Sequence, residues 1–382
     1  MNRCEWIKAI LAGEPDVPVA QQWMGFFNAE LARRLTPKEC HYKPMWIYDR
    51  PDYFDFSGIG AAELDKMVAF NHYTGQSMSM LGPGANQAFG HGLPGEFACR
   101  VIEKNEKEII LEYETGVKAQ VRFQPHFYHF FDHPLNDKHD VEKLILPEPD
   151  DPSRYEGLRS DAEYLRKKGE YVAGSLNGLF SALHYFLMDY EQLLMAIALE
   201  QDFIRECLRR LGEWNLKVAA RMLDAGLDGL VFCDDLGSKE NLLISPVMYR
   251  ELIKPWHSRI CELAHEKGAT VHLHSHGAIQ PILDDFVECG FDMINPFDPE
   301  EGHDIEAVLE KYADKFVVVG GFPTYFWSWP GQQQEEYLEK MGNLGRKYIR
   351  YIFMDSSGVP EHVSREDFER INACSRRVRG IT

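Results

Sequence analysis

Three histidines occupy alternate positions in one short stretch, and their spacing could place two imidazoles on one metal ion. The stretch 269–277 reads Ala-Thr-Val-His-Leu-His-Ser-His-Gly, which is typical of a short buried strand bounded by turns. Side chains alternate along a strand, so His272, His274 and His276 begin on one face, with about 6.6 Å between neighbours and about 13 Å between the outer two. We therefore predict that the chain bends after His274 and that His274 and His276 bind a metal. The alternative is that these histidines hydrogen-bond to polar neighbours inside a barrel.

Carboxylates follow two other apolar stretches that read as strands. Leu230-Val-Phe-Cys is followed by Asp234 and Asp235, and Tyr351-Ile-Phe-Met is followed by Asp355. Carboxylates at such positions are suited to acid–base chemistry or to holding a cation. We predict catalytic roles for Asp234, Asp235 and Asp355. For the adjacent pair, the alternative is that it caps the segment that follows.

These strands belong to a regular alternation of strands and helices over the second half of the chain. Ser245 and Pro246 are typical of a helix start, an apolar stripe follows, and Gly268 ends that helix before the histidine strand begins. Five successive strand-then-helix units of this kind indicate a parallel sheet covered by helices. Candidate strands at 45–48 and 171–174, with one more not located, bring the number to eight.

The fold class that follows is α/β, a (β/α)8 TIM barrel formed by one domain over 1–382. Residues 1–40 are predicted to be a helical extension, and alternating apolar runs predict a β-meander inserted at about 97–135. In such barrels the active site lies where the strands end. The polar residues at the predicted strand ends are Asp234, Asp235, His274, His276, Asn295, Asp298, Asp355 and Ser356. Asn177 and His184 are further candidates for this pocket.

Composition excludes several classes of partner. The 382 residues carry a formal net charge of −19, which argues against binding to nucleic acid or to an anionic membrane. No apolar run approaches the roughly 20 residues that span a bilayer, and the first residues lack the apolar region of an export signal. Eight scattered cysteines without a C-x-x-C pair indicate free thiols. We expect a cytoplasmic protein that acts on a small molecule.

Four motifs together resemble the uroporphyrinogen decarboxylase superfamily. They are Cys233-Asp-Asp-Leu-Gly-Ser, Leu243-Ile-Ser-Pro-Val-Met-Tyr-Arg-Glu-Leu-Ile-Lys-Pro-Trp, Val271-His-Leu-His-Ser-His-Gly-Ala-Ile and Asp292-Met-Ile-Asn-Pro. Arg350-Tyr-Ile-Phe-Met-Asp-Ser-Ser-Gly-Val-Pro resembles the last strand of that superfamily, and the resemblance covers roughly 155–380. It implies a TIM barrel, possible dimers and one of two chemistries: decarboxylation without a cofactor, or zinc-dependent methyl transfer between a corrinoid and an acceptor.

The decarboxylase branch matches this chain poorly where it binds substrate. That branch has an arginine-rich motif after its first strand, whereas the equivalent region here reads Trp46-Ile-Tyr-Asp-Arg-Pro-Asp-Tyr-Phe and has Arg50 alone among acids. Several substrate carboxylates require several cations. The C-terminal histidine of the decarboxylases falls on Ser357. From these positions we assign Arg50, Asn177, Asn295 and Ser357 to substrate binding.

The methyltransferase branch matches better. Its zinc is held by a His-x-Cys pair and a later cysteine, and these positions fall on His274, His276 and Ser357. Serine is a poor zinc ligand, so Asp355 is our third ligand, with Asp235 and Glu301 as alternatives. A site without thiolates is harder, which favours an oxygen-bearing or other acceptor over a copy of the thiol-activating site.

Three functions follow from these matches and departures. The first is a zinc-dependent methyltransferase that moves a methyl group between a corrinoid, free or on a partner protein, and an acceptor. The second is a metal-free, decarboxylase-like carboxy-lyase in which Asp234 or Asp235 stabilises a protonated intermediate and Arg50 or Arg122 holds a carboxylate. The third is a non-catalytic relative that binds a ligand at the barrel mouth.

Overall fold

Eight parallel strands form one curled sheet at the centre of the protein. The computed structural model describes residues 1–23, 25–26, 29–42, 60–81, 97, 99–122 and 127–381. In this part of the chain the sheet has the order β1-β12-β11-β10-β9-β8-β7-β2, and neighbouring strands are parallel. The strands are β1 (Ala20–Gln22), β2 (Ser79–Leu81), β7 (Val172–Asn177), β8 (Gly229–Cys233), β9 (Thr270–His274), β10 (Met293–Asn295), β11 (Val317–Gly321) and β12 (Tyr351–Met354). The predicted TIM-barrel-like α/β class is confirmed.

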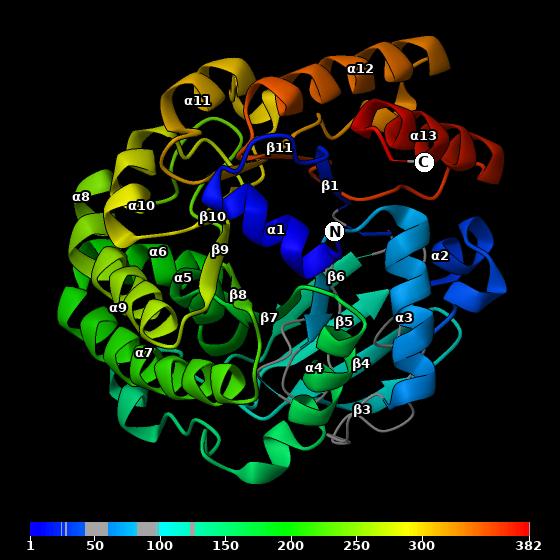
Figure 1. Cartoon of the computed structure of the whole chain (residues 1–382). Helices are drawn as coiled ribbons and strands as arrows, with labels where there is room; N and C mark the ends of the chain where they lie inside the picture. Colours follow the sequence, from blue (N-terminus) through cyan, green and yellow to red (C-terminus); the bar gives the residue numbers. More distant parts are fainter. Residues whose placement is uncertain are drawn as a thin grey trace.

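Helices surround this sheet, and one helix lies across its end (Figure 1). They are α1 (Arg3–Ala12), α2 (Ala29–Leu35), α3 (Ala61–Thr74), α4 (Leu158–Lys167), α5 (Leu179–Ala182), α6 (Tyr190–Leu199), α7 (Gln201–Asp224), α8 (Pro246–Met248), α9 (Lys254–Glu266), α10 (Leu283–Cys289), α11 (Ile305–Tyr312), α12 (Gly331–Lys347) and α13 (Arg365–Arg379). Trp6, Ile7 and Ile10 of α1 pack against the side chains that fill the barrel interior. The N-terminal helix therefore closes the end of the barrel opposite the strand C-termini.

The two edge strands, β1 and β2, are joined by side chains instead of a strand ladder. The Gln76 side chain accepts from the Trp23 N–H at 2.8 Å and donates to the Trp23 carbonyl at 3.1 Å. The Gln22 side chain accepts from the Ser77 N–H at 2.9 Å, and the Ser77 hydroxyl donates to the Gln21 carbonyl at 2.8 Å. These bonds satisfy backbone groups that a ladder would otherwise pair.

The first two barrel strands are ones that the sequence did not locate. β1 and β2 have three residues each, and β1 reads Ala-Gln-Gln, so neither shows the apolar run on which the prediction relied. The candidate strand at 45–48 lies outside the described residues. The candidate at 171–174 corresponds to β7. Two short or polar strands escaped because their pairing comes from the closure of the sheet and not from local β-propensity.

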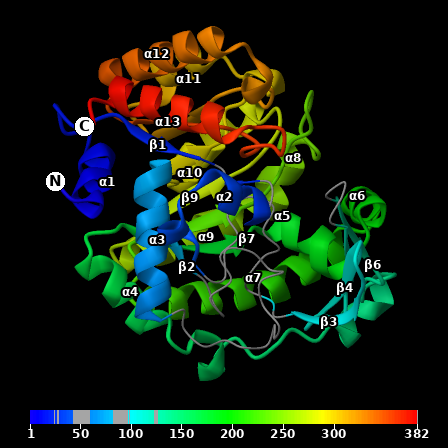
Figure 2. The same cartoon turned by 90° about the vertical axis from the view of Figure 1, so that its right-hand side faces the viewer.

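The inserted meander is a separate antiparallel sheet of four strands, in the order β3-β4-β5-β6. They are β3 (Cys99–Lys104), β4 (Glu108–Tyr113), β5 (Lys118–Arg122) and β6 (Phe127–Phe131). Tyr113 and Phe130 contact Phe186 on a π-helical turn, η6 (Leu183–Leu187), with ring centroids 5.2 and 5.7 Å apart. The meander therefore packs on the segment that follows β7, to one side of the barrel (Figure 2).

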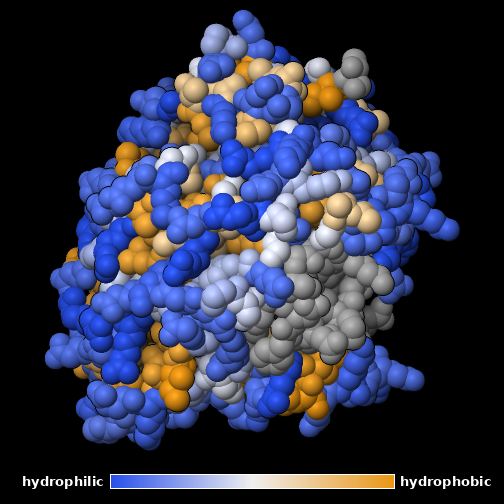
Figure 3. Space-filling model, turned by 60° about the horizontal axis from the view of Figure 1, so that its bottom comes forward, coloured by the Kyte–Doolittle hydropathy of each residue, from blue (hydrophilic) through white to orange (hydrophobic). Residues whose placement is uncertain are grey.

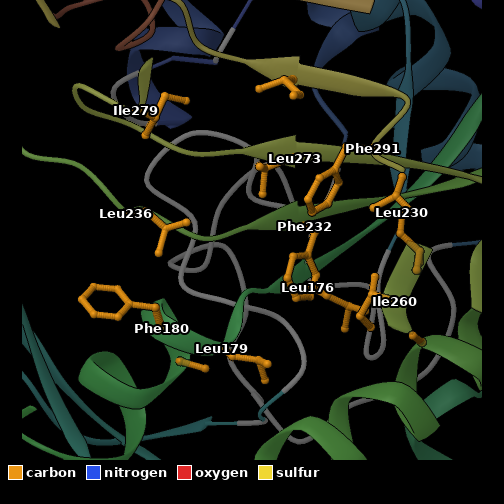
Figure 4. Packing of buried hydrophobic residues seen from close by; sticks show 14 of the residues in the cluster. Leu176, Leu179, Phe180, Leu230, Phe232, Leu236, Ile260, Leu273, Ile279 and Phe291 are labelled. Carbon is orange, nitrogen blue, oxygen red and sulfur yellow. The ribbon is translucent and has the colours of Figure 1, made fainter. Parts of the chain in front are cut away.

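Apolar side chains form two layers, one inside the sheet and one between the sheet and its helices. Val231 and Met293 belong to the inner cluster. Phe232 and Leu273 belong to the outer cluster, and each directly follows an inward-facing residue in its strand. Ile260 of α9 lies in the same outer cluster (Figure 4). This alternation places the even-numbered histidines of β9 on the inner side.

The outer surface is mainly hydrophilic on the face seen in Figure 3, with small separate hydrophobic areas. Among the described residues, no helix combines the length and the apolar character that crossing a bilayer requires. All eight cysteines are free, as the sequence predicts.

The loops that follow β8 and β9 touch through two glycines. A Cβ atom on Gly277, whose φ is +96°, would lie 2.1 Å from the carbonyl carbon of Gly237. The Gly237 N–H also donates to the His276 carbonyl at 3.1 Å. Because both loops carry the polar residues at the barrel mouth, this contact fixes how these residues face one another.

We expect Gly277→Ala to destabilise the protein much more than Gly268→Ala. Gly268 also has a positive φ, +72°, but a Cβ there would meet nothing within 4 Å. Gly268→Ala should therefore cost only the backbone strain of about 1 kcal/mol, whereas Gly277→Ala adds a clash and should cost at least about 3 kcal/mol. Urea unfolding of both variants measures the difference, and equal losses would contradict the contact.

Candidate functional site

The chain leaves the sheet directly after His274, which brings two imidazoles together. β9 ends at His274, as the sequence predicts, and His276 follows in the loop. The ring centroids of His274 and His276 are 4.9 Å apart, with planes at 83°. The His274 side chain is 9% exposed and that of His276 is 30% exposed, so the pair lies at the boundary between the barrel interior and its mouth.

Asp235 faces both imidazoles from the neighbouring loop. Its Oδ1 accepts from the His276 backbone N–H at 2.8 Å and lies 3.7 Å from Nε2 of His274. The Asp235 N–H donates to the Ser181 hydroxyl at 2.9 Å. Burial would raise the pKa of Asp235, but the two imidazoles and the His276 amide lower it overall. The group at the centre of this cluster is therefore a carboxylate at neutral pH.

Each imidazole is held through Nδ1 by a different polar partner. Nδ1 of His274 is 3.0 Å from Nδ2 of Asn295, and Nδ1 of His276 is 2.8 Å from Oε1 of Glu301. Burial lowers the pKa of His274 to about 4. Burial also acts to lower the pKa of His276, but Glu301 and Asp235 outweigh it and raise that pKa. His276 is thus the more basic of the two imidazoles, because only it has a carboxylate on Nδ1.

Glu301 itself is half-buried against His276 at the end of a 3-10 turn, η9 (Pro299–Glu301). Burial would raise its pKa, but the hydrogen bond and the charge of His276 lower it overall. Its other oxygen, Oε2, is buried without a hydrogen bond. The carboxylate therefore serves mainly to orient and charge the imidazole.

The donor types at this cluster suit zinc. Two imidazoles and a carboxylate are a familiar catalytic set, and two donors on a tetrahedral zinc lie about 3.3 Å apart, close to the 3.7 Å between His274 and Asp235. Metal-binding histidines commonly donate their second N–H to a carboxylate or carbonyl, and Glu301 offers this to His276. At His274 it is the nitrogen of the Asn295 amide that faces Nδ1. In the described part of the chain, no three or more His, Cys, Asp or Glu side chains are already arranged to hold an ion.

The side chain of Asp234 points away from the histidine cluster that Asp235 faces. It is fully buried: Oδ2 is 2.9 Å from Nε2 of His257 on α9, and Oδ1 accepts from the Ser181 N–H at 2.8 Å. The other nitrogen of His257 is 3.1 Å from the Tyr249 hydroxyl. A Cβ on Gly178 would overlap Asp234, so glycine is needed beside this carboxylate. Asp234 therefore ties β8 to its helices, and its catalytic role stays a prediction.

The other predicted site residues lie around the barrel mouth at different distances from this cluster. Asp355 is buried after β12, which β10 and β11 separate from β9. Ser357 is half-buried, with its hydroxyl 3.5 Å from the Thr324 carbonyl. Asn177 is buried at the end of β7, in register with Cys233. Arg50 lies outside the described residues. Of the predicted substrate-binding residues, the structure brings Asn295 into the histidine cluster.

The π-helical turn η6 carries His184 and Tyr185 close to the Asp235 carboxylate. Burial lowers the pKa of His184 to about 4, against the charges of Asp235 and Asp234. Burial and the Asp235 charge both raise the pKa of Tyr185. π-Helical turns are frequent at functional sites. No sequence pattern marks this turn, although His184 was a candidate for the pocket.

His272, the third histidine of the strand, lies deeper in the barrel. It is 2% exposed and pairs in register with Val231 on one side and Met293 on the other. Neither ring nitrogen makes a hydrogen bond of good geometry, although the Asn295 side chain is close enough to act against the lowering of its pKa. Burial lowers its pKa to about 3. His272 therefore lies in a different layer of the barrel from His276, as their spacing of about 13 Å along an extended strand predicts.

Comparisons with known proteins agree with this architecture. A methyltransferase from Methanosarcina mazei has the same fold, with a TM-score of 0.66, 16% identity and coverage of 99% of each chain. A chitinase from Chromobacterium violaceum matches with a TM-score of 0.36 and 8% identity, over 61% of this chain and 84% of the other. The second match is too weak to support an argument. Among curated proteins no match was found.

The sequence also matches a family model described as uroporphyrinogen decarboxylase (URO-D). The match covers residues 113–378, more than half of the 382-residue chain, and includes β7 to β12 with the histidine cluster. This chain therefore belongs to the uroporphyrinogen decarboxylase (URO-D) family.

Proposed function

We propose that this protein is a metal-dependent methyltransferase that moves a methyl group between a corrinoid, or a methylated small molecule, and an acceptor. The observation that supports it best is the pair His274 and His276, each held through Nδ1, with Asp235 facing both. A methyltransferase from Methanosarcina mazei has a similar fold. The motifs of this chain also resemble the methyltransferase branch of the superfamily more than its decarboxylase branch. The corrinoid is either free or carried by a partner protein.

In this proposal His274, His276 and Asp235 hold zinc. Bound zinc acts as a Lewis acid and lowers the pKa of a group in its open position. Asn295 and Glu301 orient the two imidazoles through Nδ1. His276 then keeps Nε2 for the metal, whereas His274 offers the lone pair of Nε2 only when the Asn295 amide turns its oxygen toward Nδ1. Asp235 offsets the charge of a bound cation. A donor set of nitrogen and oxygen favours an oxygen-bearing acceptor over a thiol.

The third ligand in this proposal is Asp235, not Asp355. Asp235 lies on the strand next to β9 and already contacts the His276 amide, whereas two strands separate Asp355 from β9. An acidic residue can complete a coordination sphere only if it reaches the same ion as the imidazoles. Asp355 is left with a role toward substrate at the same mouth.

The decarboxylase alternative has less support. Arg122, one of the two arginines considered for it, is on β5 of the meander, 3.5 Å from Glu108 and over the ring of Phe127. It thus belongs to a surface pairing on the inserted sheet. The remaining arginine, Arg50, is outside the described residues. A substrate with several carboxylates needs more than one cation.

We expect protein purified without a histidine tag to bind about one zinc per chain and to demethylate methylcobalamin when an acceptor is supplied. His274→Ala and His276→Ala should lose both properties, because each removes a nitrogen donor. Metal analysis and the absorption change of the corrinoid measure them. His265→Ala is the matched control, since His265 is an exposed histidine paired with Asp292. A wild-type protein that binds no zinc after reconstitution and moves no methyl group would overturn the proposal.

A comparison of three carboxylate variants identifies the third ligand. Asp235→Asn should weaken zinc binding at least about tenfold, and Glu301→Gln should weaken it about 10–100-fold, because its partner imidazole loses its orienting carboxylate. Asp355→Asn should change zinc affinity by less than about threefold. Competition with a chromogenic chelator gives the affinities. A large effect of Asp355→Asn with a small effect of Asp235→Asn would transfer the ligand role to Asp355.

The metal-free protein should also depend on pH through the His276–Glu301 pair. Because the pKa of His276 is raised, its contribution to folding stability is complete below about pH 6.5 and is lost as the pH rises through the pKa of the folded state. Because the pKa of Glu301 is lowered, its contribution is complete above about pH 4.3 and is lost as the pH falls through the pKa of the folded state. Glu301→Gln should thus cost about 1 kcal/mol near pH 5.5 and less near pH 8.5. Urea unfolding at both pH values measures this, and an equal cost would contradict the pairing.

A further inference from the structure

Three polar atoms inside the barrel have no hydrogen-bond partner, and they lie next to the histidine cluster. They are Nδ1 and Nε2 of His272 and Oδ1 of Asn295. Both residues are buried, at 2% and 0% exposure. His272 pairs in register with Met293, and His274 pairs with Asn295, so the three polar side chains occupy successive positions on the inner side of β9 and β10. Buried polar groups rarely stay unpaired, so this arrangement calls for a use.

The Asn295 side chain has one amide end for each of the two histidines, His274 and His272. One end of its amide, Nδ2, is 3.0 Å from Nδ1 of His274, and the other end, Oδ1, is unpaired. An amide presents donors at one end and an acceptor at the other, whereas a neutral imidazole presents one donor and one acceptor. His272 is buried without an acidic partner, so it is neutral and offers either type of nitrogen.

We propose that His272 is a positioning residue that, through the Asn295 amide, couples the orientation of its own ring to the tautomer of His274. In the first arrangement, Nδ2 of Asn295 donates to Nδ1 of His274, and the His274 proton is on Nε2, toward Asp235. The His272 ring then turns an N–H toward Oδ1 of Asn295. In the second arrangement the amide is reversed, His274 carries its proton on Nδ1, and His272 accepts from the amide.

The exchange between these arrangements changes no charge. In His274 the Nε2–H bond breaks and an Nδ1–H bond forms, and water at the barrel mouth carries this proton. His272 keeps its proton and turns its neutral ring to present either its N–H or its lone pair to the amide. The structure has the first arrangement at the Asn295–His274 contact. Only the second leaves the lone pair of His274 Nε2 free toward Asp235. The relay itself rests on the hydrogen-bond geometry; its value for holding zinc rests on the proposed function.

Replacement of His272 by methionine tests the relay without any metal. A thioether accepts weakly and cannot donate, so His272→Met should favour the reversed amide and shift His274 toward its Nδ1–H tautomer by at least about threefold. His272→Gln retains a donor and an acceptor and should keep the wild-type ratio. Met293→Leu alters the same interior layer without a polar change and is the control for packing. The nitrogen-15 chemical shifts of labelled His274 report the tautomer at constant pH.

Two outcomes would overturn the relay. One is an unchanged His274 tautomer in a folded His272→Met protein. The other is the same shift when Asn295→Leu is added, because the coupling would then not pass through the amide. Zinc titration of the same variants is a separate readout: binding tighter than wild type in His272→Met supports the use in metal binding, whereas no zinc binding in any variant overturns that use and leaves the tautomer result as evidence on the relay.

Discussion

The bend of the chain directly after His274 is the constraint on which the candidate site depends. If the strand continued, the imidazoles of His274 and His276 would share a face but would lie about 6.6 Å apart along the barrel wall. Instead, the His276 amide donates to Asp235 and the His276 carbonyl accepts from Gly237, so both backbone groups of one residue tie this loop to the neighbouring loop. The close approach of Gly277 to Gly237 leaves no room for a side chain there. Backbone bonds, and not the imidazoles themselves, thus set the geometry of the pair.

A second group of residues determines what the two imidazoles can do. Asn295 and Glu301 both contact Nδ1, but one is a neutral amide and the other a carboxylate. The consequence is a pKa for His274 lowered to about 4 by burial and a raised pKa for His276. Two chemically identical side chains, two residues apart, therefore differ in basicity because one faces the Asn295 amide at the end of β10 and the other the Glu301 carboxylate from the segment after it.

The adjacent aspartates show how far the sequence could be followed. Consecutive side chains of an extended segment point to opposite sides, so Asp234 and Asp235 cannot both face the same cavity. The structure gives Asp234 to the helical layer, where His257 is its partner, and Asp235 to the mouth. The sequence identified both as residues at a strand end but contained no sign of which one faces inward. That choice depends on His257, which lies on the next helix, and on the space left by Gly178.

The sequence by itself determined the barrel class, the strand–helix units after residue 229, the inserted meander and the strand end at His274, because periodicity, caps and glycines act within a few residues. Only the tertiary structure decided the short strands β1 and β2, which are joined through glutamine and serine side chains, and the partners of each histidine. Asn295 and Glu301 are 21 and 25 residues from the imidazoles they hold. Such pairs form when parallel strands bring their ends together, and a local sequence pattern does not predict which distant side chains come into contact there.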